Sequence, residues 1–131
     1  MTNKLSEAYL QNFSGTESYT YGPFKRFVMT DGLVFLMANG CAWLVDAIAS
    51  HQTSDVQKRA DGFQVWTLQR NDNGDVNLVC TDGNYNAIVS QQIEFTDFPF
   101  ERFPSGLTVY VEYGSIDGVT PCWVAMLPSE R

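Results

Sequence analysis

The feature that most constrains the fold is a change of hydrophobic period near Phe63. Between Thr30 and Gln52, apolar residues recur at the three- and four-residue spacing of a helix, whereas FQVWTLQR at 63–70 alternates residue by residue, as a strand does. Helical and extended patterns therefore occupy separate halves of the chain. The sequence predicts an α+β fold, in which N-terminal helices pack on one face of a mainly antiparallel sheet of about four to five strands.

Two shorter segments precede the apolar stretch. Leu5–Asn12 places its apolar residues on one helical face, with Thr2 or Asn3 as the predicted N-cap. In the polar loop that follows, Tyr19 and Tyr21 alternate. They either form an edge strand or expose two rings to a partner.

The apolar stretch itself divides at Asn39-Gly40. Residues 32–39 have two interpretations: one strand of a hairpin that turns at Asp31-Gly32, or a helix capped by Thr30 and ended by a left-handed Gly40. We favour the helix. Cys41–Gln52 is predicted as a second helix, and because it is apolar nearly all round, we expect it to be the buried centre of the domain. The polar segment 53–62 is read as a connection that ends in an Asp-Gly turn.

The second half reads as strands and turns. Strand patterns at 63–70, 76–81 and 87–96 predict an antiparallel meander, and the shifting apolar face of the third suggests a bulge. Residues 107–127 read as a final hairpin, with Pro121 at an edge or at a strand start.

The net charge restricts the kind of partner. The 131 residues, which fit a single domain spanning 1–131, carry 15 acidic and 8 basic side chains, giving a charge of −7. An acidic surface repels nucleic-acid backbones and anionic membranes, so neither is predicted as a direct partner. The charge suits solubility, or a basic protein partner.

Composition gives no indication of a metal, cofactor or membrane. Cys41, Cys80 and Cys122 form no CxxC pair, so we expect buried free thiols in a reducing cytoplasm. The N-terminus lacks the apolar segment of a signal peptide, and the unbroken apolar run Leu33–Ala38 is too short to span a bilayer. The predicted location is the cytoplasm.

Three residues are weak candidates for acid–base chemistry. His51 is the only histidine, and a continuing helix would place Asp55 one turn later on the same side. Asp46 lies in mid-helix among apolar residues, where burial of a carboxylate is costly unless it is paired. We favour structural roles: His51 as a helix C-terminal residue that bonds the last carbonyls, and Asp46 as a buried hydrogen-bond acceptor.

The predicted binding residues lie in the second half. Asp72, Asp75 and Asp82 occupy turns; the 72–75 turn lacks the ligand pattern of a calcium loop and is read as a hairpin turn. A proline-interrupted segment at 96–106 carries Phe98, Phe100 and Phe103. Burial of each ring contributes about 2 kcal/mol, so this segment must pack on the core or on another protein.

Several blocks of this chain carry a family resemblance: TDG at 30–32, AWLVDAIASHQ at 42–52, FQVWTL at 63–68, IEFTDFPF at 93–100 and MLPSE at 126–130. In this order they resemble a family of small uncharacterised bacterial proteins, a domain of unknown function found on plasmids, phages and other mobile elements. The resemblance implies an accessory gene of a mobile element and assigns no activity to any residue. The segment 114–122 is longer than the resemblance leads us to expect.

The leading hypothesis is a non-catalytic, acidic protein-binding protein. Its partner would be a basic, nucleic-acid-binding protein or complex of host defence, contacted through the acidic turns or the phenylalanine segment. The first alternative is a small hydrolase-like enzyme that uses His51 with Asp46 or Asp55. The second is a structural homo-oligomer that buries the phenylalanine segment at its self-interface.

Overall fold

The computed structural model describes residues 5–22, 26–84, 86–94, 96–115 and 117–131. Its strands are β1 (Thr20–Tyr21), β2 (Phe27–Met29), β3 (Phe63–Arg70), β4 (Val76–Thr81), β5 (Ala87–Ile93), β6 (Leu107–Gly114) and β7 (Cys122–Met126). Its helices are α1 (Glu7–Leu10), α2 (Asp31–Leu36), α3 (Ala42–Ser50) and α4 (Ser54–Ala60). A π turn, η1, covers Met37–Cys41, and 3-10 turns cover Phe100–Arg102 (η2) and Pro128–Glu130 (η3).

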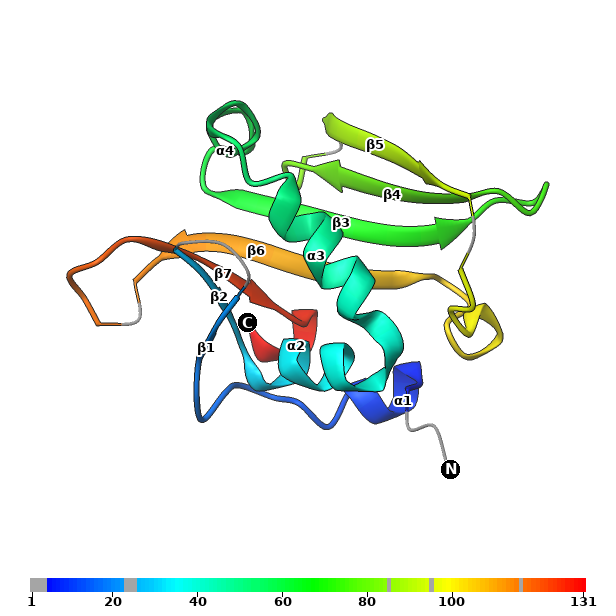
Figure 1. Ribbon diagram of the computed structural model, residues 1–131, viewed down its shortest axis with the longest axis horizontal. Coiled ribbons are helices and arrows are strands. Elements are labelled where there is room, and N and C mark those ends of the chain that lie inside the picture. Colours follow the sequence, from blue (N-terminus) through cyan, green and yellow to red (C-terminus); the bar gives the residue numbers. More distant parts are fainter. Residues whose placement is uncertain (1–4, 23–25, 85, 95, 116) are drawn as a thin grey trace.

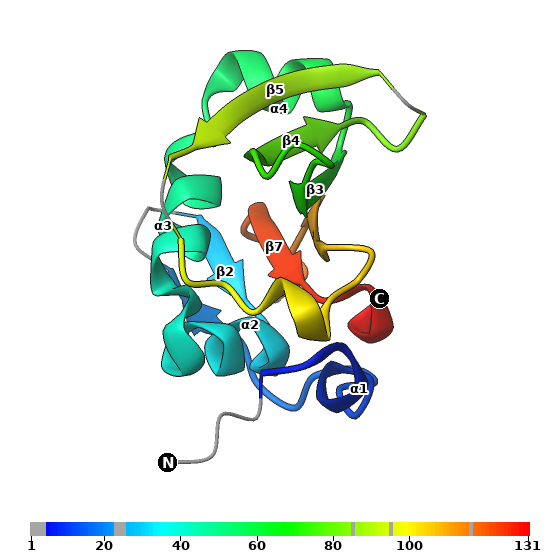
Figure 2. The same cartoon turned by 90° about the vertical axis from the view of Figure 1, so that its right-hand side faces the viewer.

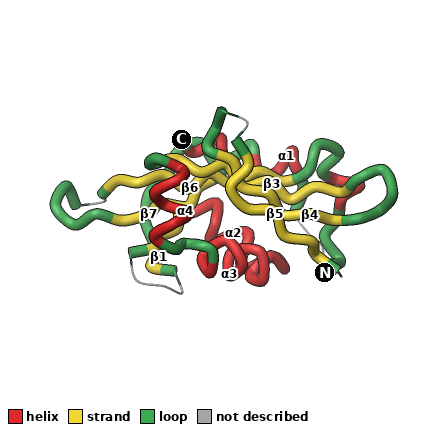
Figure 3. The backbone as a smooth tube through the Cα atoms, turned by 90° about the horizontal axis from the view of Figure 1, so that it is seen from above, coloured by secondary structure: helices red, strands yellow, loops and turns green. Residues whose placement is uncertain are grey.

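The strands form one sheet in the order β1-β2-β7-β6-β3-β4-β5, with α2 and α3 on one face (Figures 1 and 3). Every neighbouring pair is antiparallel except β2 and β7, where Val28 lies opposite Val124. The predicted α+β class is confirmed, but the sheet has seven strands, more than we predicted. The difference arises at β1 and β2, which join the sheet through β7, because periodicity does not reveal pairing between segments so far apart in sequence.

Local patterns in the second half were predicted correctly. Along β3, Gln64, Trp66 and Leu68 are buried under the helices, whereas the alternate residues lie on the opposite, half-buried face. The pairing of β4 with β5 shifts its register between Cys80 and Thr81. This irregularity is the bulge that the sequence suggested for β5. Phe95, in the predicted extension of β5, lies outside the described residues.

The last hairpin lies where the sequence predicted it, but its second strand is not at an edge of the sheet. Pro121 directly precedes β7, so the proline marks a strand start. β7 is not an edge strand, because it lies between β2 and β6. The backbone N–H of Trp123, on the β2 side, donates to the carbonyl of Arg26 (2.7 Å).

The Thr30-Asp31-Gly32 sequence begins α2, so the helix interpretation is confirmed and the hairpin is wrong. Thr30 occupies the N-cap position, but its hydroxyl donates to Oε1 of Glu130 (2.6 Å) and not to the helix. The backbone N–H of Gly32 donates to Oε2 of the same carboxylate (3.0 Å). Glu130 therefore supplies the side-chain cap that the sequence had assigned to Thr30.

Asp31 ties the preceding polar loop to the start of α2. Its carboxylate accepts hydrogen bonds from the backbone N–H of Glu17 (3.0 Å) and the hydroxyl of Ser18 (2.8 Å). Its own N–H donates to Oγ1 of Thr16 (2.9 Å). These hydrogen bonds, that from Glu17 first, lower the pKa of Asp31 below its usual value.

The two central helices meet at a kink and not at a loop. Asn39 leaves helical geometry, and Gly40 has φ of +94°, the left-handed conformation predicted for it. The π turn η1 then joins α2 directly to α3. Gly40 thus ends the first helix locally, while the chain continues on the same side of the sheet (Figure 1).

α3 contributes four buried residues to the core, as expected of the central helix, but the prediction that Asp46 is buried is wrong. Leu44 and Ile48 face the sheet, whereas Asp46 and Ser50 are exposed. Consecutive residues on a helix point about 100° apart, so apolar neighbours in sequence do not bury a residue between them.

Residues 53–62 contain a helix, α4, that we did not predict. Thr53 is its N-cap and accepts a hydrogen bond from the N–H of Val56 (3.3 Å), and the helix ends at Asp61 in the left-handed conformation. The signals were present in the sequence: a capping threonine, an acidic first turn, a basic last turn, and Val56 with Ala60 as the buried pair.

The phenylalanine segment packs inside the domain. Phe98, Phe100 and Phe103 are all buried, and their rings contact one another at centroid distances of 4.8 and 4.9 Å. Of the two outcomes expected for this segment, packing on the core is the one found. The three rings are therefore not available at the surface, either to a partner or as a self-interface.

The N-terminal elements are shorter than predicted. α1 begins after Ser6, whose hydroxyl accepts the N–H of Tyr9 (3.2 Å); Thr2 and Asn3 lie outside the described residues. Tyr19 and Tyr21 flank or belong to the edge strand β1, and both side chains are exposed. The edge strand and the exposure of both rings are therefore found together, while a partner for them stays a prediction.

By length and composition, one described segment resembles a membrane span. The kinked helix Asp31–Ser50 has 20 residues and a mean hydropathy of 1.7. Leu33, Leu44 and Ile48 on it are buried against the sheet. A core helix satisfies the same criteria, so this segment is weak evidence for a membrane location.

Candidate functional site

His51 ends α3, as predicted, but its side chain does not bond the last carbonyls of the helix. The amide oxygen of Gln91 on β5 accepts a hydrogen bond from Nε2 of His51 (2.8 Å). The imidazole also stacks on Trp66, with ring centroids 5.4 Å apart. Both contacts fix the ring between helix and sheet, which is a structural role.

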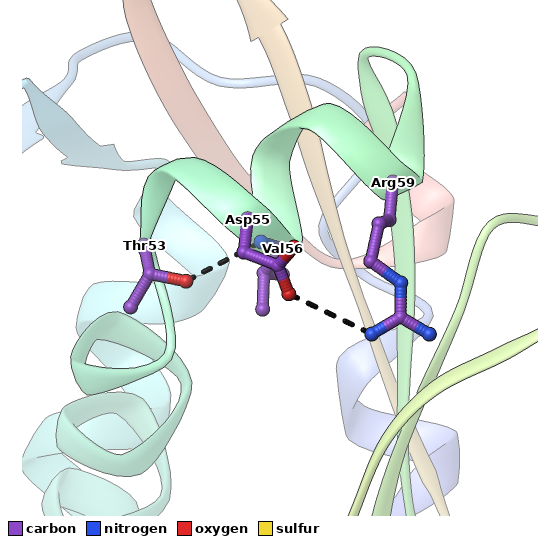
Figure 4. Close-up of polar contacts among 4 residues, drawn as sticks. All are labelled: Thr53, Asp55, Val56 and Arg59. Carbon is purple, nitrogen blue, oxygen red and sulfur yellow. Dashed lines mark hydrogen bonds and ion pairs between the residues drawn. The ribbon is translucent and has the colours of Figure 1, made fainter.

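Neither carboxylate candidate joins His51. α3 stops at Ser50, and Asp55 lies in α4, exposed and paired with Arg59 (3.6 Å), as Figure 4 shows. Asp46 faces solvent on α3. The hydrolase-like arrangement predicted as an alternative is therefore not assembled by these three residues.

The cysteines are equally unsuited to nucleophilic chemistry. Cys41, Cys80 and Cys122 are all buried and free. Burial, and to a lesser extent the charge of Asp97, raises the pKa of Cys41 to about 11. Burial and the charge of Asp82 raise the pKa of Cys80 to about 12. A thiol must ionise to react or to bind a metal, and these two do not at neutral pH. Within the described ranges, no cluster of histidine, cysteine and carboxylate side chains could hold a metal ion.

A buried amide network lies behind His51. Oε1 of Gln64 accepts hydrogen bonds from Nε1 of Trp66 (2.7 Å) and from the Gln52 amide (2.8 Å). The Gln64 amide donates in return to Oε1 of Gln52 (2.9 Å). Sequence reasoning missed this network, although a glutamine on the same strand face as Trp66 and Leu68 was its signal.

Carboxylates gather at one end of the sheet. The β3–β4 turn carries Asp72 and Asp75, and the pairing of Val76 with Ile93 brings the end of β5 beside it. The chain continues from there into the phenylalanine segment. The exposed carboxylates of these segments, which we call the acidic end, are Asp72, Asp75, Glu94, Asp97 and Glu101. Figure 2 views the molecule from this side.

The acidic end is built on ordered structure. Arg70 lies over the ring of Phe100, with its guanidinium carbon 5.1 Å from the ring centroid. A shallow cleft of about 260 Å³ has Arg70, Asp75, Glu94 and Phe100 in its lining. The turn itself is closed by the N–H of Asn71, which donates to the carbonyl of Asp75 (2.7 Å).

Asp82, the third acidic turn residue predicted to bind, lies at the other end of β4. Its carboxylate accepts hydrogen bonds from the side chain of Asn86 (2.9 Å) and from the N–H of Asn84 (2.8 Å). These bonds, the Asn86 side chain first, lower the pKa of Asp82. The structure therefore keeps Asp72 and Asp75 together in one turn, separates Asp82 from them, and brings Glu94 beside them through the pairing of β4 with β5. Asp97 and Glu101 follow Glu94 along the chain.

Two larger clefts among the described residues hold no convergent reactive groups. The first, about 440 Å³, lies where α1, η3 and the start of β6 meet, with Leu10, Phe103 and Leu127 in its lining. The second, about 380 Å³, is lined by Arg26, Gln57 and other residues at the opposite end of the sheet.

The sequence matches a family of unknown function, DUF6876, over residues 4–131. The chain belongs to this family. No curated protein and no solved structure shows significant similarity to it.

Membership confirms that the chain belongs to a family of unknown function and brings no activity with it; the origin in a bacterial mobile element stays a prediction. In this family member, the recognisable TDG and MLPSE segments meet at the Glu130 cap of α2. IEFTDFPF contributes to the packed phenylalanine segment, and the histidine of AWLVDAIASHQ bonds to β5. These sequence blocks therefore have structural explanations.

Proposed function

We propose that the protein is a small, acidic, non-catalytic protein-binding accessory protein of a mobile element, and that the acidic end contacts its partner. The partner would carry a basic surface, as a nucleic-acid-binding protein or complex of host defence does. The observation that carries the proposal is the gathering of exposed carboxylates from two separate segments, 71–75 and 94–101, at one end of the sheet.

Charge and rigidity both support a binding role. Arg70 and Arg102 are the basic residues within these two segments and their immediate flanks, and Arg70 is engaged with Phe100. The carboxylates therefore outnumber the local cations, and a field of one sign steers an oppositely charged protein toward this surface. Because the segments are held by the turn and by the buried rings, little ordering entropy is lost on binding.

The enzyme hypothesis gains no support from the geometry. The imidazole of His51 is engaged with Gln91 and Trp66, while Asp46 and Asp55 face solvent on other sides of their helices. A binding surface is the better explanation of the same chain.

The test is capture of host proteins on the immobilised protein, with two charge-matched variants. Asp72→Lys/Asp75→Lys alters the acidic end, whereas Asp46→Lys/Asp55→Lys makes the same change of charge on the helices. We expect the first variant to lose the captured partner and the second to keep it. The captured complex should also dissociate as salt is raised, because exposed charges are screened.

His51→Ala is the second control and should retain the partner. Equal loss in both lysine variants would show that only net charge matters, and the proposal would be wrong. Loss in His51→Ala alone would favour the enzyme hypothesis.

A further inference from the structure

The two edges of the sheet are very different. β1 has two residues, and short edge strands are one way in which proteins prevent unwanted pairing. β5, at the other edge, has seven residues and the sequence AIVSQQI. It contains no charge, proline or glycine, so it lacks the other usual protective residues.

Within the described part of the chain, no strand pairs with the outer side of β5, although α4 lies close to the strand. Its inner side pairs with β4 from Val76↔Ile93 to Thr81↔Ala87. None of the backbone hydrogen bonds that described residues make outside helices and ladders involves residues 87–93. The register shift opposite Cys80 and Thr81 distorts only the first residues of the strand, so Val89–Ile93 remains regular.

We propose that β5 pairs antiparallel with β5 of a second copy of this chain, which joins the two sheets across a two-fold axis at Ser90. A two-fold contact uses the same surface twice, so a strand must be complementary to itself. Centred on Ser90, the register places Val89 opposite Gln91 and Ile88 opposite Gln92. All these pairs are neutral, which matters in a chain of charge −7.

The ends of the strand support this register. Ser90 is the middle residue of Ala87–Ile93, so the two-fold axis there gives the longest overlap. Glu94 of each copy lies beyond the regular pairs, near the irregular residues 86–88 of the other copy, none of which carries a charge. Moving the two-fold axis to Gln91 would instead place Glu94 opposite Ile88. Like charges directly opposite one another destabilise a strand pair, and the Ser90 register has none.

The contact is independent of the acidic-end proposal and is expected to be reversible. Even if all seven residues of β5 pair, the contact extends for roughly 23 Å, and such a strip is smaller than a standard interface of about 1,600 Å². The dimer should therefore form with rising concentration. Its helices remain on one face, since the pairing preserves the sides of both sheets.

Sedimentation equilibrium of the full chain tests the association. The average mass should rise with concentration from 14.7 kDa towards twice that value. Ser90→Lys places two lysines opposite each other and should weaken the dimer at least tenfold. Ser105→Lys, the same change at an exposed turn, should leave it unchanged. A constant monomer mass, or equal dimerisation of both variants, would overturn the proposal.

Cysteine cross-linking tests the register. The native cysteines are buried, so Ser90→Cys adds an accessible thiol that faces its own copy at about 5 Å between Cβ atoms, close enough to form a disulfide with small adjustment. Gln92→Cys is the matched control, because its two copies would be about 13 Å apart along the strands. We expect a disulfide-linked dimer from Ser90→Cys and none from Gln92→Cys. Cross-linking of both variants to the same extent would refute the Ser90 register.

Discussion

Replacement of Gly32 by alanine is the sharpest test of how the two ends of the chain are joined. Gly32 lies in the first turn of α2, and alanine normally stabilises a helix by up to about 1 kcal/mol relative to glycine. Here the added Cβ would lie 2.5 Å from Oε1 of Glu130 and 2.6 Å from Cδ1 of Leu127. Both atoms would have to move.

The magnitude follows from what the displaced atoms do. Glu130 accepts hydrogen bonds from the hydroxyl of Thr30, from the N–H of Gly32 and from the N–H of Leu127 (2.9 Å). Hydrogen bonds to a charged group contribute roughly 1.5–3 kcal/mol each, and overpacking costs about 1–3 kcal/mol. We expect Gly32→Ala to lower the free energy of unfolding by about 2–3 kcal/mol, which is opposite in sign to the usual helix effect.

The assay is urea denaturation at neutral pH, with Gly114→Ala as the control. A Cβ at Gly114 would meet nothing within 4 Å, so its stability should change by less than about 0.5 kcal/mol. The slope of unfolding free energy against urea should stay constant in both variants, since the surface exposed on unfolding is the same. If Gly32→Ala proved neutral or stabilising, the close approach of Glu130 to α2 would be wrong.

Three other predictions follow from buried or hydrogen-bonded groups. Gln64→Ala should destabilise the protein by about 2–4 kcal/mol, because it leaves a cavity and leaves buried hydrogen-bond donors without an acceptor. Gln69→Ala, on the exposed end of the same strand, should be nearly neutral. Thermal unfolding measures the stability of both variants. The pKa of Asp31 is lowered in the folded protein, so its carboxylate adds stability at pH values above its usual pKa of 3.8, and this stability is lost as the pH falls below 3.8. In Asp31→Asn, the free energy of unfolding in urea should therefore fall less between pH 7 and pH 3 than it does in the unchanged protein. The thiols of Cys41 and Cys80 should fail to react with a thiol reagent at pH 8 in the native protein and react fully in denaturant; rapid native labelling would contradict their burial and raised pKa values.

Much of the local structure was accessible from the sequence. The alternation of β3 and β4, the hairpin turn at 71–75, the left-handed Gly40 and the helix ending near His51 all depend on residues within a few positions of one another. Periodicity and turn preferences depend on residues a few positions apart, so they can be recognised without knowledge of tertiary contacts. α4 could also have been predicted, from Thr53 as its N-cap and from the charges of its first and last turns, but we did not predict it.

A functional site depends on contacts between distant parts of the chain, which local sequence patterns do not reveal. Sequence alone could name Asp72 and Asp75 but not Glu94 beside them, since that proximity depends on the pairing of β4 with β5. It could not show that Asp46 faces solvent, because burial depends on which side of α3 meets the sheet.

From the sequence alone we obtained the central helices, five of the strands, the α+β class and the acidic character. Tertiary structure alone decided the parallel pairing of β2 with β7, the capping of α2 by Glu130, the acidic end, and which strand lies at the open edge. Backbone propensity and hydrophobic period depend on residues that are close in sequence, so they can be recognised without a structure. Hydrogen-bond partners and exposed strand edges depend on how the whole chain packs, and residues far apart in sequence decide them.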